Sequence, residues 1–151
     1  MKRIGICIFL TLGSILSASA DFSGMNGRWN GPGTVMNDQR EVKDCGAVSI
    51  EVNRTETMLE FPDGLDNCQI ISEFIDPVRF EIHEGQLFLK GKPVGEISEQ
   101  KVRIKVQNTK DGFSELLELE LVNGHLAYHD VISLIGESGT MTIKSLLSLK
   151  P

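Results

Sequence analysis

The sequence predicts an all-β protein, an antiparallel meander that closes into a small barrel of about eight strands, with a two-sheet sandwich as the alternative. Apolar and polar residues alternate with period two over several short segments, which places one face on a core and the other in water. Turn-forming pairs such as Asn123-Gly124 recur between these segments, and this pair is typical of a tight hairpin. Many connections are shorter than the roughly dozen residues that a parallel crossover needs.

The predicted strands are the alternating segments, which span 48–52, 78–83, 86–90, 101–107, 117–121 and 140–149. In each of them, Val, Ile, Leu, Phe and Met mostly occupy one parity and polar residues the other. One stretch is ambiguous, because Ser114 can serve as the N-cap of a helix over the following residues. The alternation from Leu117 to Leu121 favours a strand instead.

Turn signals separate these strands at intervals of about ten residues, as expected for a sandwich or barrel. Glycine in such pairs supplies the positive φ that tight turns need. The signals are Pro62-Asp63-Gly64, Glu84-Gly85, Asp111-Gly112, Asn123-Gly124 and Ser138-Gly139.

The first twenty residues have the pattern of a cleavable signal peptide. A basic start, Lys2-Arg3, precedes an apolar run over 4–16, and Ala18-Ser19-Ala20 resembles a signal peptidase site. We expect cleavage after Ala20 and a single β-barrel-like domain over 21–151 that is periplasmic or secreted. An uncleaved anchor is the alternative, but the run is shorter than the roughly 20 apolar residues of a membrane span. A lipoprotein would need a Cys at the cleavage point, whereas Cys7 lies inside the apolar run.

The chain is acidic, and loss of the leader makes it more so. Its formal net charge is −6, and removal of Lys2 and Arg3 takes it to −8. Binding to nucleic acid or to an anionic membrane depends on Lys and Arg, so we expect neither partner. No second long apolar run follows the leader, so we expect no stable membrane anchor.

Two cysteines, Cys45 and Cys68, remain after the leader. An even number of cysteines in a small exported domain indicates a disulfide, and these two permit one intramolecular pairing. A metal or redox pair is the alternative, but the chain has no C-x-x-C motif. We therefore predict a Cys45–Cys68 disulfide, worth about 3 kcal/mol by the chain-entropy estimate.

The first strand carries the segment Gly27-Arg28-Trp29-Asn30-Gly31-Pro32-Gly33, whose Gly-x-Trp start resembles that of lipocalins and avidin-like β-barrels, the calycins. The resemblance implies that the Trp packs across one end of an up-and-down barrel whose other end admits a ligand. The Thr-Asp-x-x-Tyr motif of lipocalins is missing, and no Arg follows Arg103 on the late strands. The single Trp argues against biotin binding. Only Gly27 and Trp29 carry over, as structural positions.

The sequence presents no catalytic, metal or cofactor site, and we expect no enzyme. His125, His129 and Asp130 are the best metal candidates, but on a strand the two histidines are roughly 13 Å apart, so we expect them to be solvated. The segment Gly136-Glu137-Ser138-Gly139 is a turn rather than a nucleophile motif. No phosphate-binding glycine-rich loop is present in the sequence.

These patterns predict a small, exported, soluble binding protein, whose lipocalin-like barrel holds an apolar small molecule. No ligand-binding residue is identified by the sequence, because a barrel of about eight strands can be filled by side chains or can hold one small ligand. The alternative is a periplasmic protein–protein interaction or inhibitor module, in which an acidic face docks on a basic envelope protein.

Overall fold

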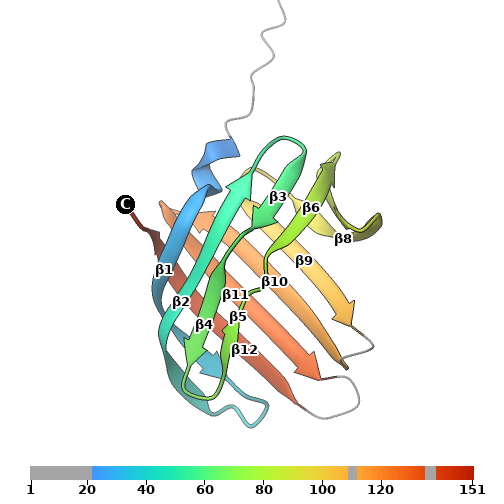
Figure 1. Ribbon diagram of the computed structural model, residues 1–151. Helices are drawn as coiled ribbons and strands as arrows, with labels where there is room; N and C mark the ends of the chain where they lie inside the picture. The colour runs from blue at the N-terminus through green and yellow to red at the C-terminus, as the bar shows by residue number, and fades with distance from the viewer. Residues whose placement is uncertain (1–21, 109–111, 135–138) are drawn as a thin grey trace, which may run out of the picture.

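A computed structural model describes residues 22–108, 112–134 and 139–151, and their fold is all-β (Figure 1). The predicted leader, its cleavage site, Asp111 and Ser138 lie outside these residues. A single 3₁₀ turn, η1 (Phe22–Met25), precedes the strands in the described chain. The strands are β1 (Gly27–Met36), β2 (Val42–Arg54), β3 (Met58–Phe61), β4 (Gly64–Cys68), β5 (Ser72–Phe74), β6 (Val78–His83), β7 (Gln86–Leu89), β8 (Lys92–Ile97), β9 (Lys101–Asn108), β10 (Phe113–Val122), β11 (His125–Leu134) and β12 (Thr140–Leu149).

All strand pairings in the described residues are antiparallel, and they close the sheet into a barrel. β1 pairs with β2 on one edge and with β12 on the other, so the circuit runs through β1, β2, β3, β6, β7, β8, β9, β10, β11 and β12. The predicted barrel is confirmed, with ten strands in the circuit rather than about eight. Pro93 and Gly95 interrupt the alternation of β8, which is why the sequence does not predict that strand.

On one side of the barrel, two neighbouring strand positions are each occupied by two short strands in place of one long strand. The long strand β2 pairs with β4 over its first half and with β3 at its end, and Pro62-Asp63 separates those two short strands. In the neighbouring strand position, β5 pairs with β4 and β6 pairs with β3. The break between β5 and β6 falls at residues 75–77. Figure 1 shows that β6 and β8 lie near the η1 end, while β9 and β10 continue well below them.

The tight hairpins follow from residues with positive φ. Glu84-Gly85 has φ values of 51° and 79°, and Asn123-Gly124 has the same pair of values. Positive φ at both central residues is the conformation of a type I′ turn, which matches the twist of the flanking strands. A third turn of this kind, Lys90-Gly91 with φ values of 52° and 76°, joins β7 to β8.

The predicted disulfide is confirmed. Cys45 and Cys68 are bonded, and they are directly opposite each other on β2 and β4. Both are buried, and the ladder shifts register between Cys45 and Ala47. The disulfide therefore attaches the short strand β4 to β2 beside a β-bulge, where the hydrogen bonds between the two strands are interrupted.

The hydrophobic core lies inside the barrel. Its largest fully buried side chains are Trp29, Phe61, Met25, Ile50, Leu59, Leu87, Leu119, Leu126, Ile143 and Leu147. These residues come from strands on all sides of the barrel, as the period-two pattern requires. No helix in the described part of the chain is long and apolar enough to cross a membrane.

Candidate ligand-binding cavity

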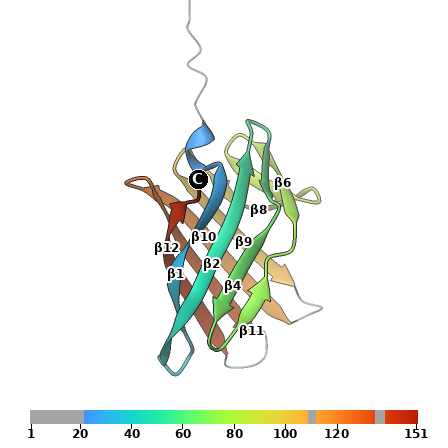
Figure 2. The same ribbon diagram turned by 60° about the vertical axis from the view of Figure 1, so that its left-hand side comes forward.

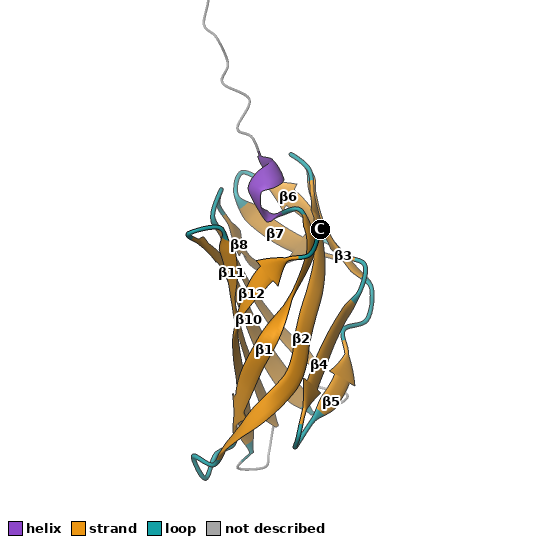
Figure 3. Cartoon of the chain, turned by 90° about the vertical axis from the view of Figure 1, so that its left-hand side faces the viewer, coloured by secondary structure: helices purple, strands orange, loops and turns teal. Residues whose placement is uncertain are grey.

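The 3₁₀ turn η1 lies at one end of the barrel (Figure 3), and Trp29 follows it near the start of β1. The Trp29 side chain is 2% exposed, and its Nε1 donates a hydrogen bond to the carbonyl of Met25 at 2.8 Å. Gly27 has a φ of 126°, and a Cβ there would lie 2.6 Å from Cδ1 of Leu149. Gly27 and Trp29 therefore seal this end of the barrel, and neither contacts the cavities described below.

A second set of hydrogen bonds holds the same end together. The side chain of Asn26 accepts a hydrogen bond from the backbone N–H of Arg54 at 2.6 Å and donates one to its carbonyl at 3.0 Å. The Arg54 guanidinium in turn donates to the carbonyl of Ser98 at 2.6 Å. These contacts join the segment after η1, the end of β2 and the β8–β9 turn.

The opposite half of the barrel is hollow. A first cavity of about 240 Å³ lies between β4 and the strands β10, β11 and β12. Its apolar lining includes Ile71, Ile132, Leu134 and Met141.

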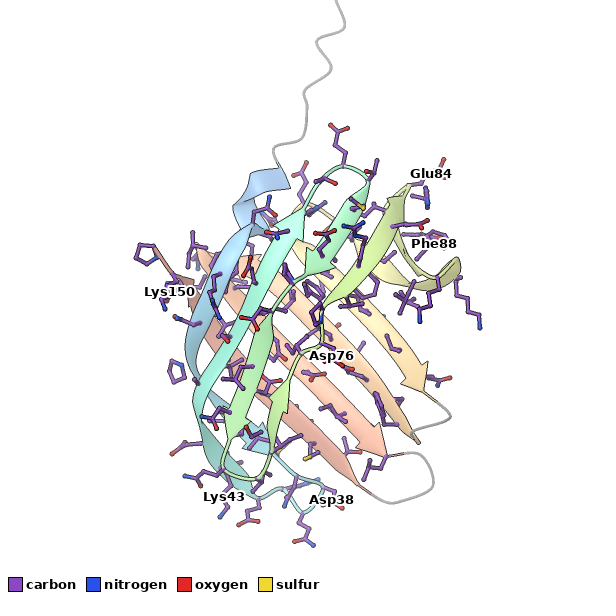
Figure 4. The ribbon with its side chains drawn as sticks, in the orientation of Figure 1. Asp38, Lys43, Asp76, Glu84, Phe88 and Lys150 are labelled. Atoms are coloured by element: carbon purple, nitrogen blue, oxygen red, sulfur yellow. A yellow bond between two sulfur atoms is a disulfide. The ribbon has the colours of Figure 1, made fainter. Side chains whose placement is uncertain are left out.

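A second cavity of about 250 Å³ adjoins the first and opens through the side of the barrel. Ile75, Phe113 and Glu115 line both cavities. Asp76, which is exposed, lies at the mouth, and Figure 4 places it midway along the barrel on the segment between β5 and β6. The gap between β5 and β6 therefore coincides with the opening of the hollow half.

Acidic side chains lie on the inner face of the hollow half. On β11 the inward parity is Leu126, Tyr128, Asp130 and Ile132, and Asp130 lies between Leu117 of β10 and Ile143 of β12. Asp66 projects inward from β4 across the barrel. Asp66 and Asp130 are each 3% exposed, and both line the first cavity together with Glu115.

Tyr128 links this acidic group to the filled half of the core. Its hydroxyl donates a hydrogen bond to Oδ2 of Asp66 at 2.9 Å. Burial raises the pKa of Tyr128 well above its ordinary value, and the nearby carboxylates of Asp66, Asp130 and Glu115 raise it further. The phenol therefore stays protonated and orients the Asp66 carboxylate.

The structure separates the residues that the sequence grouped as metal candidates. His125 and His129 lie on the outer face of β11, where His129 is 3.3 Å from Glu118 and His125 is 3.3 Å from Ser148. Asp130 lies on the inner face of the same strand. Within the described residues, no three His, Cys, Asp or Glu side chains are grouped as ligands for a metal ion.

The sequence reasoning missed the residues that line the hollow half. The available signal was a polar residue at a core position of a strand. Glu115 shares the parity of Leu117 and Leu119, and Asp130 shares the parity of Leu126. Asp66 offered a weaker signal because β4 is short and was not predicted.

Other grooves in the described part of the molecule lie outside the barrel. One of about 610 Å³ is lined by Glu84, Glu96, Arg103 and Lys105 around the β8–β9 surface. Another, of about 590 Å³, lies beside Lys90 at the β7–β8 turn. Their charged linings suit hydration, whereas small-molecule sites are mostly apolar with a few placed polar groups.

Comparison with known proteins leaves the cavity as the main guide to function. No protein-family model matches the chain, and no curated protein matches it.

Proposed function

We propose that the protein is an exported binding protein that holds an apolar small molecule in the hollow half of its barrel. The observation that carries this proposal is the pair of adjoining cavities, each near 250 Å³, that share Ile75, Phe113 and Glu115. Jointly they fall within the range of roughly 300–1,000 Å³ typical of small-molecule sites.

In this proposal, the η1 end of the barrel provides stability and the opposite end provides the binding cavity. Trp29 and the hydrogen bonds around Arg54 stabilise the filled end. The fold can therefore stay stable although the other end contains cavities. A pre-formed cavity on a rigid scaffold binds without the cost of ordering itself. The signal-peptide pattern and the Cys45–Cys68 bond support the export part of the proposal, because disulfides persist in oxidising compartments.

The outer face gives less support to a protein-docking role through an acidic surface. Its acids alternate with bases on neighbouring strands, as in the pairs Arg103–Glu118 at 3.1 Å and Lys101–Glu120 at 3.9 Å. Such cross-strand pairs neutralise each other and leave no field of one sign along these strands.

The test is saturable binding of N-phenyl-1-naphthylamine, a neutral apolar fluorophore that brightens in apolar surroundings. We expect the folded protein to bind it and an Ile132→Trp variant, whose indole fills the first cavity, to bind it at least about tenfold more weakly.

Val131→Trp is the matched control, because Val131 is the neighbouring residue on β11 and faces outward. This variant should bind the fluorophore like the parent protein. Absence of saturable brightening in the parent, or equal binding by both variants, would overturn the proposal.

A further inference from the structure

Three lysine side chains gather in the groove of about 590 Å³ between the β7–β8 turn and β9. Lys90 and Lys92 line it from the turn, and Lys105 lines it from β9. All three are exposed, and none of the described residues that line the groove is an Asp or a Glu. The groove is therefore a basic site on a chain whose formal net charge is −6.

These lysines differ from many of the basic side chains elsewhere on the outer face, which have carboxylate partners. Arg28, for example, pairs with Asp63 at 2.6 Å, and Arg103 pairs with Glu118 at 3.1 Å. Within the described chain, no carboxylate forms an ion pair with any of the three lysines of the groove. Their ammonium groups are therefore available to a bound anion.

The groove exists because β8 and β9 pair over only part of their length. Their pairing ends at Gly95 and Ile104, while Lys92 and Pro93 pair with β7 instead. Pro93 also lacks the backbone N–H that a further ladder hydrogen bond would use. Figure 1 shows β9 continuing past β8 towards the opposite end of the barrel. Past Ile104, β8 therefore does not continue the barrel wall alongside β9.

Two apolar side chains connect this groove with the second cavity. Leu89 of β7 and Val106 of β9 line both of them. Val106 shares the parity of Ile104, which is buried inside the barrel. An apolar chain that passes between Leu89 and Val106 would therefore reach the part of the cavity that is lined by Phe80 and Ile104.

We propose that the ligand is an anionic amphiphile, whose apolar chain occupies the second cavity and whose head group lies in the groove between Lys90, Lys92 and Lys105. This inference rests on the proposed function and adds the charge class of the ligand to it. The ammonium groups donate hydrogen bonds to carboxylate or phosphate oxygens of the head group. Only the uncharged chain enters the cavity, whose own lining includes Asp76 and Glu115.

The experiment measures displacement of N-phenyl-1-naphthylamine by decanoate, decanol and decylamine at neutral pH and low ionic strength, below their aggregation concentrations. The three probes share a chain and differ in head group as anion, neutral hydroxyl and cation. We expect decanoate to compete about three- to tenfold more strongly than decanol, because each exposed lysine contributes a weak ion pair. Decylamine should compete least. Salt at about 0.5 M should remove most of the preference, since it screens exposed charges.

Two double variants of equal net charge assign the preference to the groove. Lys92→Gln combined with Lys105→Gln should bring decanoate and decanol to within about twofold of each other. Lys144→Gln combined with Lys150→Gln is the matched control and should keep the preference, because both lysines are exposed and neither lines the groove. Figure 4 places Lys150 on the side of the molecule away from Phe88 and the β7–β8 turn. Fluorescence of Trp29 checks that both variants are folded.

The outcomes separate this inference from the proposed function. Equal competition by decanoate and decanol in the parent protein would overturn the inference while leaving apolar binding intact, and stronger competition by decylamine would do the same. An equal loss of preference in the two double variants would also overturn it, because net charge and not the groove would then be the cause. If the fluorophore does not bind at all, the proposed function fails first.

Discussion

At the scale of single residues, the most informative group is the phenol of Tyr128. It is 2% exposed and donates its hydrogen bond to a buried carboxylate. Burial and the surrounding carboxylates raise its pKa in the folded protein. In the unfolded chain the same phenol loses its proton near pH 10, so the unfolded state binds fewer protons above that pH.

The stability of the protein is therefore expected to fall as the pH rises above about 10. The contribution from Tyr128 is complete below this pH and is lost as the pH approaches the raised pKa of the folded state. A Tyr128→Phe variant should lack this loss, and at neutral pH it should be less stable by about 1.5–3 kcal/mol, because Asp66 loses a hydrogen bond to its charge.

Urea unfolding at a series of pH values measures both effects. Tyr128 is the only Tyr in the chain, so the near-ultraviolet absorbance of phenolate reports this group alone. We expect phenolate to form together with unfolding. Phenolate that forms near pH 10 in a still-folded protein would contradict the assignment.

At the scale of single elements, the pairing of β8 with β9 requires a residue without a side chain at Gly95. A Cβ at Gly95 would lie 2.0 Å from the carbonyl oxygen of Arg103 on β9, the strand that closes the barrel beside it. The two backbones would have to separate, and strain of this kind costs about 1–3 kcal/mol. Gly95→Ala should lower the free energy of unfolding by that amount.

Gly46→Ala is the control for that substitution, measured in the same urea titration. A Cβ at Gly46 would meet Asn67 at 3.8 Å, an ordinary contact. Its effect should lie within about 1 kcal/mol of zero, because less freedom in the unfolded chain offsets small adjustments in the fold. Equal losses for the two variants would show that close approach of β8 to β9 is not the cause.

At the scale of the whole molecule, closure brings the described ends of the chain together. Trp29 pairs with Leu149, and the backbone N–H of Lys150 donates to the carbonyl of Arg28 at 2.8 Å. Figure 2 shows the C-terminus beside the start of β1 near η1. Breaking the chain elsewhere and joining these ends should therefore preserve every strand pairing.

A circular permutant that joins Pro151 to Phe22 through a short Gly/Ser linker and opens the chain between Asn123 and Gly124 is expected to fold. Exposed turns tolerate such cuts. Its circular dichroism and Trp29 fluorescence should match those of the parent and be lost in a single unfolding transition. A permutant opened between Leu119 and Glu120, inside a buried strand, should fail to fold. Failure of both permutants would contradict this view of closure.

Strands whose side chains alternate cleanly between apolar and polar could be predicted from the sequence, because an alternation with period two shows which face is buried. This is why β6, β9 and β12 match their predicted ranges closely, and why the Asn123-Gly124 hairpin and the Cys45–Cys68 bond were predictable from local chemistry. Short strands broken by proline or glycine, such as β4 and β8, carry too few alternating positions to be predicted.

The position of the cavities inside the barrel follows from the folded arrangement of the strands and not from any local sequence pattern. Asp66 and Asp130 are 64 positions apart in the sequence numbering, and nothing local shows that they line one cavity. Their meeting depends on the register of β4 against β2, which places Asp66, and on the register between β10, β11 and β12, which places Asp130. The alternation in the sequence indicates which face of each strand points into the barrel. The volume of the cavities and the grouping of acidic residues in their lining depend on which strands face each other across the closed barrel.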